Sequence, residues 1–221
     1  FAIGGVLAIA VFYIRRGLVE TQSFRTAKSE GGPKSSGWML FTRYPKEALM
    51  VLTLTAGGTL AFYTYTTYLQ KFLVNTSGFS KQTATEITTA ALFVFMLCQP
   101  VAGALSDRVG RKPLMVGFGI LGVLFTYVIF SRLAVTESPY LAFALALTGL
   151  LIVTGYTSIN AVVKAELFPS HIRALGVALP YALANTIFGG TAEWVALTFK
   201  QTGYESSFFW YVTIMIGLSL I

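Results

Sequence analysis

Seven apolar runs dominate the sequence, and their lengths constrain the fold more than any other feature. A helix needs about 20 mostly apolar residues to cross the hydrocarbon core of a membrane. The five middle runs are long enough, whereas the first and the last have 14 residues each. Strands are disfavoured because the long runs lack a clean alternation of apolar and polar residues. The sequence therefore predicts an all-α integral membrane protein, with apolar segments at 1–14, 47–69, 84–105, 114–131, 140–163, 175–199 and 208–221.

The composition agrees with a membrane protein and disfavours other classes. Only 11% of the residues are charged, whereas a soluble domain has about 25%. The sequence has no nucleotide-binding loop, metal-ligand cluster or catalytic triad pattern, so it predicts neither an enzyme nor a cofactor or metal site. The single cysteine, Cys98, excludes a disulfide within the chain. Because the chain begins at Phe1 and both ends lie inside apolar runs, we expect it to be a piece of a longer protein.

The basic residues assign the connections between the runs to two sides of the membrane. Connections 15–46, 106–113 and 164–174 hold 12 of the 16 lysine and arginine residues, and they alternate along the chain with connections that hold the other four. Positive residues collect on the cytoplasmic side. We therefore expect the first group to be cytoplasmic, and the net charge of +7 to reflect topology rather than nucleic-acid binding. The 12 residues are Arg15, Arg16, Arg25, Lys28, Lys34, Arg43, Lys46, Arg108, Arg111, Lys112, Lys164 and Arg173; the four are Lys71, Lys81, Arg132 and Lys200.

Residues 15–46 form a polar linker whose centre reads KSEGGPKSSG. Gly, Ser, Pro and Lys predominate, which is typical of a flexible connection. The predicted domains are the end of one helix at 1–14, the cytoplasmic linker at 15–46 and a six-helix bundle at 47–221. The six helices could divide into two sets of three, as in transporters with inverted repeats, but no internal sequence repeat demonstrates it.

The stretch GALSDRVGRKPLM, residues 103–115, concentrates charge between two long apolar runs. A short positive cytoplasmic loop accounts for its basic residues but not for its ordered glycines and aspartate. The pattern G-x-L-x-D-R-x-G-R-K resembles the cytoplasmic loop signature of the major facilitator superfamily, which lies between the second and third helices of each half. It has the matching place in this chain. The signature residues are Gly103, Leu105, Asp107, Arg108, Gly110, Arg111 and Lys112.

A second stretch, KAELFPSHIRALG at 164–176, resembles the E-x-x-P-x-x-x-R loop of the same superfamily. It places Glu166 and Arg173 near helix ends, as the first stretch places Asp107 and Arg111. We hypothesise that these two sets of opposite charges form a lock that closes the cytoplasmic side while the central cavity faces outward. Partly exposed pairs are individually weak, about 0–1 kcal/mol. A network of them is enough to bias two states of similar energy.

Four further stretches resemble the metabolite:proton symporters of the superfamily. The resemblance covers nearly the whole chain and implies the C-terminal half of such a transporter, from the end of helix six into a truncated helix twelve. It implies proton-coupled symport of α-ketoglutarate or a similar dicarboxylate across the bacterial inner membrane by alternating access. The implied partners are that substrate, protons, membrane lipid and the N-terminal half. The stretches are FYTYTTYLQKFLVNT (62–76), TAALFVFML (89–97), YALANTIFGGTAEWVAL (181–197) and FFWYVT (208–213).

Three alternatives to this function stay open at the level of sequence. Related symporters with the same fold carry citrate, shikimate, proline or betaine. A non-transporting membrane receptor would need a large soluble signalling domain, which this piece does not contain. A channel fits less well, because the two motif loops suit a gated bundle with two states.

Three spans carry polar residues on one face, which fits a bundle around a hydrated cavity because polar groups facing lipid are costly. The candidates for lining the substrate path are Tyr63, Tyr156, Asn160 and Asn185, whose hydroxyl and amide groups can donate to carboxylates; the pattern fits a structural role equally well. Threonine in membrane helices often bonds backbone, so Thr55 and Thr59 are expected to be structural. The stripes are Thr55, Thr59, Tyr63 and Thr66; Tyr156, Asn160 and Lys164; and Tyr181, Asn185, Gly189 and Glu193.

Glu193 is the only acidic residue well inside a predicted span. A buried carboxylate could take up and release a proton during transport, so Glu193 is the proton-coupling candidate; lining the outer mouth or bonding a neighbouring helix is the alternative. Gln99, beside Pro100, is expected to bond backbone freed by the proline. Lys164 and Lys71 are expected to extend to the two membrane surfaces. The cation for an anionic substrate is therefore expected in the N-terminal half.

Overall fold

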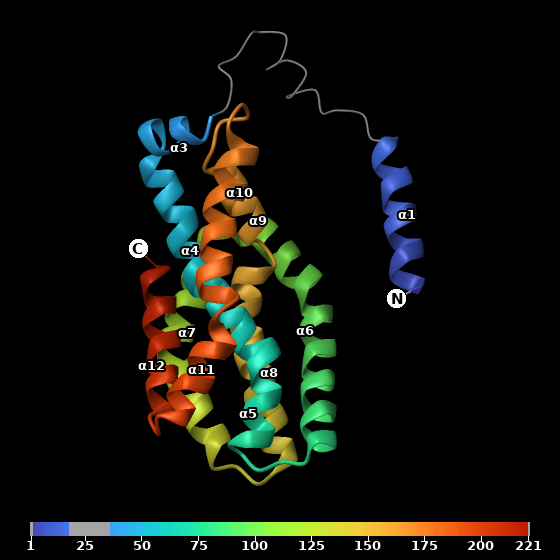
Figure 1. Cartoon of the computed structure of the whole chain (residues 1–221), viewed down its shortest axis with the longest axis vertical. Coiled ribbons are helices and arrows are strands. Elements are labelled where there is room, and N and C mark those ends of the chain that lie inside the picture. Colours follow the sequence, from blue (N-terminus) through green and yellow to red (C-terminus); the bar gives the residue numbers. More distant parts are fainter. Residues whose placement is uncertain (1, 18–35, 221) are drawn as a thin grey trace.

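The computed structural model describes residues 2–17 and 36–220, and every regular element in these ranges is a helix. This confirms the predicted fold class of an all-α membrane protein. Figure 1 shows long helices running side by side. The elements are α1 (Ala2–Arg16), α3 (Gly37–Arg43), α4 (Pro45–Tyr63), η1 (Thr64–Tyr68), α5 (Leu69–Asn75), α6 (Lys81–Val109), α7 (Arg111–Ala134), α8 (Pro139–Thr157), α9 (Asn160–Glu166), α10 (Arg173–Ala184), η2 (Asn185–Gly189), α11 (Ala192–Gln201) and α12 (Glu205–Leu218).

The helices extend beyond the apolar runs because capping residues outside the runs start them. Ser80 accepts a hydrogen bond from the backbone of Thr83 before α6, and Ser138 accepts one from Leu141 before α8. Proline is well tolerated in the first turn of a helix, and it opens both α4 and α8. Four helical stretches of the described chain are long and apolar enough to cross a membrane: Pro45–Asn75, Lys81–Val109, Arg111–Ala134 and Pro139–Glu166.

The apolar run at 175–199 was predicted as one span, and the structure divides it. Helix α10 passes into the π-helical segment η2, and α11 begins only at Ala192. The division falls at Gly190 and Thr191, directly after Gly189, and glycine is unfavourable in the interior of a helix. The backbone N–H of Gly190 donates to the carbonyl of Asn185 at 2.8 Å, which is the wider π-type closure.

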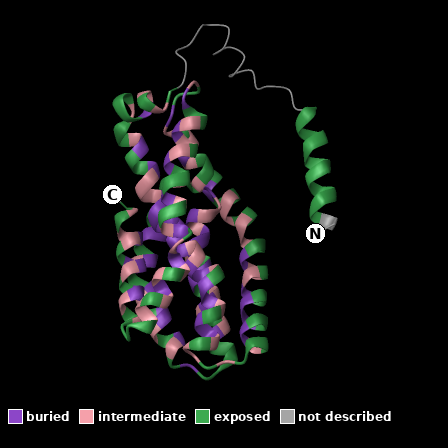
Figure 2. Cartoon of the chain, in the orientation of Figure 1, coloured by how far each residue is buried: buried purple, intermediate pink, exposed green. Residues whose placement is uncertain are grey.

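The interior of the bundle is formed by α4, α7, α8 and α12, with α6 against α8 and α10 against α4. Buried residues lie along the centre of these helices in Figure 2. Aromatic rings fill much of this core: Phe130 stacks on Phe209 with centroids 5.3 Å apart, and Phe72 meets the Phe130 ring edge-on at 5.2 Å. Such pairs add about 0.5–1.5 kcal/mol each beyond the burial of their area.

Helix α1 lies apart from the other helices in Figure 1, and its described residues from Gly4 to Gly17 are exposed. Of the predicted linker at 15–46, residues 18–35 lie outside the described residues. Its last part is ordered, because α3 follows the N-cap Ser36 and buries Leu40 completely. Leu40 packs in a cluster with Phe168 and Ile172, which lie between α9 and α10. The end of the linker is therefore a docked helix rather than a flexible connection.

Gly110 is the only residue between α6 and α7, and its backbone conformation explains why the first motif has a glycine at this position. It has φ +93° and ψ 162°, a conformation that is essentially restricted to glycine. A residue with a Cβ would be strained there. The motif glycine is thus required by the sharp reversal of the chain.

Candidate functional site

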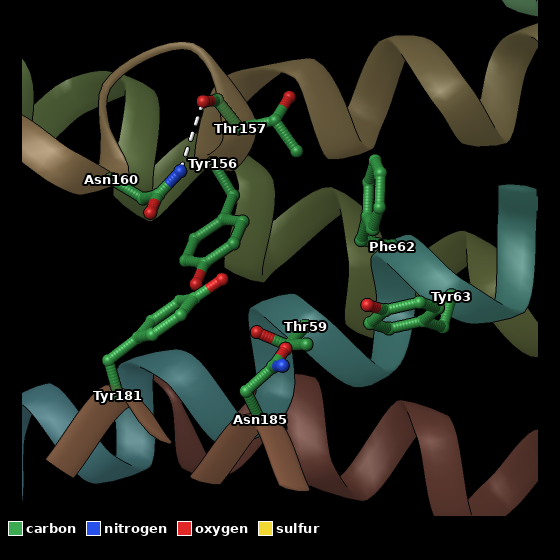
Figure 3. A pocket seen from close by; sticks show the side chains of 8 residues that line it. All are labelled: Thr59, Phe62, Tyr63, Tyr156, Thr157, Asn160, Tyr181 and Asn185. Atoms are coloured by element: carbon green, nitrogen blue, oxygen red, sulfur yellow. Dashed lines mark hydrogen bonds between the residues drawn. The ribbon is translucent and has the colours of Figure 1, made fainter. Parts of the chain in front are cut away.

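A cavity of about 250 Å³ opens between α4, α8, α9 and the α10–η2 helix, and it is the candidate site (Figure 3). Its wall carries hydroxyl and amide groups together with aromatic rings. In Figure 3 the hydroxyl ends of Tyr156 and Tyr181 point toward one another, and Thr59 lies beside Asn185. The lining residues are Thr59, Phe62, Tyr63, Tyr156, Thr157, Asn160, Tyr181 and Asn185.

The structure brings the four residues predicted for the substrate path to the wall of this one cavity. Tyr63 comes from α4, Tyr156 and Asn160 from the two sides of the α8–α9 junction, and Asn185 from η2. Their role in binding stays a prediction. Thr59 was expected to be structural, and the structure places it in the lining.

The three helical stretches that line the cavity, α4–η1, α8–α9 and α10–η2, each have an irregularity beside it. The π-helical segment η1 follows Tyr63, and η2 starts at Asn185. Between α8 and α9 the helix is interrupted at Ser158 and Ile159, and the side-chain amide of Asn160 donates to the carbonyl of Thr157 at 3.0 Å. Single π-type turns are frequent at functional sites because they displace side chains and free backbone groups.

Two glycines let aromatic side chains approach the α4 backbone and α10–η2 closely. A Cβ on Gly58 would lie 2.3 Å from carbons of the Tyr156 ring. A Cβ on Gly189 would lie 2.6 Å from the Thr59 methyl group and 2.8 Å from the Tyr63 ring. Small residues at helix contacts permit this proximity in membrane proteins. The two glycines therefore leave the space that the lining side chains of Tyr156, Thr59 and Tyr63 occupy.

Gln99 joins α6 to α8 behind the cavity. Its amide nitrogen lies 3.4 Å from both the Phe95 carbonyl and the Thr154 hydroxyl, and Thr157 donates to its amide oxygen at 3.0 Å. The prediction that Gln99 bonds backbone freed by Pro100 was wrong, because the proline leaves the carbonyl of Met96 without its donor and Gln99 contacts that of Phe95. The structure shows that two of its three contacts cross to the neighbouring helix.

Lys164 does not extend to a membrane surface, so that prediction was wrong. The residue is 1% exposed, and its ammonium nitrogen Nζ donates to Tyr156 Oη at 2.9 Å and to Asn160 Oδ1 at 3.2 Å. The nitrogen also lies 4.8 Å from the centre of the Tyr181 ring. Lys164 follows Tyr156 and Asn160 at spacings of four residues and so shares their helix face. That spacing was the signal that could have placed it beside the cavity.

Glu193 was expected to be buried, and the structure instead shows an ion pair that is partly exposed. Its carboxylate contacts the ammonium group of Lys71 on α5, and the two side chains are 34% and 49% exposed. Farther along α11, Lys200 donates to the Asn75 carbonyl at 2.8 Å and lies 3.6 Å from the carboxylate of Glu205. These contacts tie α11 and the start of α12 to the end of α5. They correspond to the alternative of a bond to a neighbouring helix.

The two motif loops meet through an ion pair that joins them rather than through pairs within each loop. Arg111 Nε lies 3.0 Å from Glu166 Oε1, and the two side chains are 39% and 54% exposed. Asp107 is exposed and has no ion-pair partner within 4 Å among the described residues. Arg173 Nε donates to the Phe168 carbonyl at 3.1 Å, so it holds its own loop. Of the four residues expected to form the charge lock, Arg111 and Glu166 are paired, and the role of the lock stays a prediction.

The other residues of the first motif are solvent-facing or partly so. Arg108 and Lys112 are exposed. Gly103 lies inside α6, and nothing in the described chain lies within 4 Å of where its Cβ would be. Gly103 therefore has no close packing partner among the described residues. The described residues hold no group of three His, Cys, Asp or Glu side chains that could bind a metal ion.

Comparison with known proteins gives consistent matches over the whole chain. Residues 15–221 match the family model described as sugar (and other) transporter. The chain is 53% identical to the alpha-ketoglutarate permease of Escherichia coli K12 over 222 residues, which cover 100% of this chain and 50% of that protein. It is 27% identical to the citrate-proton symporter of Salmonella typhi, with 96% of this chain and 49% of that protein covered. It is 28% identical to the proline/betaine transporter of E. coli K12, with 99% and 46% covered.

The chain spans about half the length of these relatives. No solved structure gives a significant match.

Proposed function

The chain belongs to the sugar (and other) transporter family of the major facilitator superfamily, and we propose that it is the C-terminal half of a proton-coupled symporter for α-ketoglutarate or a similar dicarboxylate. The observation that carries the proposal is the 53% identity over the whole chain with a permease named for that substrate. The citrate-proton symporters among the relatives support both the carboxylate class and the coupling to protons.

The partner half is an N-terminal bundle, and the two bundles alternate access to a cavity between them. The relatives' double length supports this, as does the outer face of α6. That face presents large apolar side chains at steps of four residues, as expected for contact with another bundle or with lipid. We place α1 with the N-terminal bundle, the motif loops in the cytoplasm, and the protein in the bacterial inner membrane. The exposed side chains are Phe93, Leu97, Val101, Leu105 and Val109.

The cavity suits an oxygen-rich substrate of low molecular weight. Its volume of about 250 Å³ in this half alone leaves room for a small acid and water. The amide of Asn185 and the hydroxyl of Tyr63 can donate hydrogen bonds to carboxylate oxygens. In this proposal Tyr63, Tyr156, Asn160 and Asn185 line the substrate path.

Transport in sealed vesicles tests the proposed function directly. With the full-length protein inserted and an imposed proton gradient, radiolabelled α-ketoglutarate is expected to accumulate, because the gradient drives symport. A protonophore is expected to abolish the accumulation, and unlabelled dicarboxylates are expected to compete for it. Lack of uptake by inserted, folded protein would contradict the proposal. If only proline or betaine competes, the protein would instead carry zwitterions, as the names of some of its relatives indicate for those proteins.

The proton is carried by Glu193 in this proposal. Its carboxylate pairs with Lys71, so protonation of Glu193 would remove the negative charge from the pair and loosen α11 from α5. A proton-dependent change in a contact between two helices is a direct way to couple proton binding to bundle movement.

The charge lock of the cytoplasmic side is centred on Arg111 and Glu166. The pair connects the α6–α7 reversal to the end of α9, and it can form only while these two helix ends are close. Asp107, Arg108, Lys112 and Arg173 complete the charged surface around it, and Gly103 and Gly110 shape the α6 end. Loss of the pair is expected to favour the state that is open to the cytoplasm.

Charge reversal tests this lock. Arg111→Glu or Glu166→Arg alone is expected to lower the initial rate of uptake up to about fivefold, because an exposed pair contributes at most about 1 kcal/mol. The combined swap is expected to restore most of the rate, since it rebuilds the pair with reversed polarity. The measurement is initial uptake normalised to inserted protein. Equal rates in the single variants and the swap would show that the two residues act independently.

A further inference from the structure

We infer that Lys164 supplies the positive charge that holds one carboxylate of an anionic substrate in the cavity, acting through the hydroxyl of Tyr156. This inference deepens the proposed function and rests on it for the class of substrate. It reverses the expectation that the substrate-binding cation belongs to the N-terminal half alone.

Burying the positive charge of Lys164 costs free energy. Lys164 is 1% exposed and lies in the helical stretch Pro139–Glu166, which is long and apolar enough to cross a membrane. Lysine is almost never fully buried unless its charge is paired. Ionisable groups inside membrane segments are costly, and they mark substrate or ion pathways.

In the described part of this chain, the ammonium group of Lys164 has no counter-ion. The two hydrogen-bond acceptors of Lys164 Nζ, Tyr156 Oη at 2.9 Å and Asn160 Oδ1 at 3.2 Å, are both neutral. Among the described residues, no carboxylate lies within 4 Å of it. The faces of the Tyr156 and Tyr181 rings, at 5.2 and 4.8 Å, give only the weaker cation–π attraction. An anion in the cavity would supply the missing charge.

The side chains around the ammonium group of Lys164 connect it to the cavity. Tyr156, Asn160 and Tyr181 all line the cavity (Figure 3). The same three side chains surround Lys164 Nζ. The Tyr156 oxygen accepts a hydrogen bond from the ammonium group, so its own O–H can donate to a carboxylate that enters the cavity. A donor polarised by a neighbouring cation makes a stronger hydrogen bond.

The position of Lys164 also makes the site selective for anions over zwitterions. A cation that faces the cavity through neutral groups attracts a net anion, such as a dicarboxylate, more strongly than a zwitterion whose ammonium group it repels. The same cavity without Lys164 would keep its hydroxyl and amide donors but lose this preference.

The test compares Lys164→Met with wild type in the full-length protein purified in detergent. The probes are α-ketoglutarate, citrate and glycine betaine, and the readouts are radioligand binding and the ligand-induced rise in melting temperature. Lys164→Met is expected to weaken binding of the anionic probe at least about 30-fold, because it removes a buried charge partner. Lys81→Met, at the exposed start of α6, is the matched control and is expected to bind as wild type does.

Two further readouts separate binding from a structural role. Without ligand, Lys164→Met is expected to melt at or above the temperature of wild type, because an apolar residue replaces an unpaired buried charge. Tyr156→Phe is expected to weaken anion binding as well, and adding it to Lys164→Met is expected to cost little more, because both act through one hydrogen-bonded path. Additive losses would overturn the Tyr156 path.

The inference is overturned if Lys164→Met binds the anion as wild type does, if the protein binds betaine but neither anion, or if wild type binds none of the probes. Failure of the proposed function gives a different result. In that case the wild type binds an anion and Lys164→Met does not, but vesicles with the wild-type protein show no proton-driven accumulation.

Discussion

Replacing Glu193 by glutamine in the full-length protein is expected to reduce proton-driven accumulation of substrate to the level seen with a protonophore. Glutamine keeps the shape of the side chain and can still accept a hydrogen bond from Lys71, but it cannot carry a proton. Exchange of labelled for unlabelled substrate across the vesicle membrane needs no net proton movement. Exchange is therefore expected to persist. The measurement is the ratio of accumulation to exchange in the same vesicle preparation.

Lys71→Gln is the matched control for this prediction. It breaks the same ion pair from the other side but leaves the carboxylate of Glu193 in place. If the pair only holds α5 against α11, both variants should lose transport to the same extent. If Glu193 carries the proton, accumulation should survive better in Lys71→Gln than in Glu193→Gln. Normal accumulation in Glu193→Gln would place the coupling site elsewhere and leave the pair a contact between helices.

Much of the bundle follows from properties that are local in the sequence. Run length and the lack of alternation predict helices across a membrane, and the structure has helices there. The path candidates were found because residues spaced by three or four share a helix face. This holds well enough that Tyr63, Tyr156, Asn160 and Asn185 line one cavity, although they come from three helices.

The sequence could not predict what depends on neighbouring helices. Lys164 lies near the end of an apolar run, where a lysine usually reaches the surface. The structure buries it because Tyr156, Asn160 and the Tyr181 ring surround its ammonium group. Glu193 lies deep in an apolar run by count, yet α11 starts anew at Ala192, which brings its first turn against α5. Because the helix is broken before Ala192, Glu193 is partly exposed and paired, although its position along the run predicted burial.

The same limit applies to the charged motifs. Opposite charges within one loop are the simplest pairs to expect from sequence. The contact between Arg111 and Glu166 requires that the α6–α7 reversal lie next to the end of α9. The packing of α8 against both α6 and α7 determines that arrangement, and no short stretch of sequence encodes it.

Gly58→Ala is expected to lower the affinity for substrate about tenfold or more, with a smaller effect on folding. A Cβ at this position would lie 2.3 Å from the Tyr156 ring, so the ring must move toward the cavity or the helices must separate. Overpacking of this kind costs about 1–3 kcal/mol, whereas alanine returns about 1 kcal/mol through its better helix propensity. The net loss of stability is therefore small, but the hydroxyl of Tyr156 no longer lies where the substrate meets it. Binding affinity and melting temperature measure the two effects separately.

Gly117→Ala provides the matched control for Gly58→Ala, because nothing lies within 4 Å of a Cβ at Gly117 of α7. This variant is expected to bind substrate normally and to melt at or above the wild-type temperature. Adding Tyr156→Leu to Gly58→Ala removes the ring that the new methyl group displaces. The double variant is expected to regain melting temperature without regaining affinity, because the packing is relieved but the hydroxyl is absent. Recovery of affinity in the double variant would mean that Tyr156 fills space beside the cavity and makes no contact that the substrate needs.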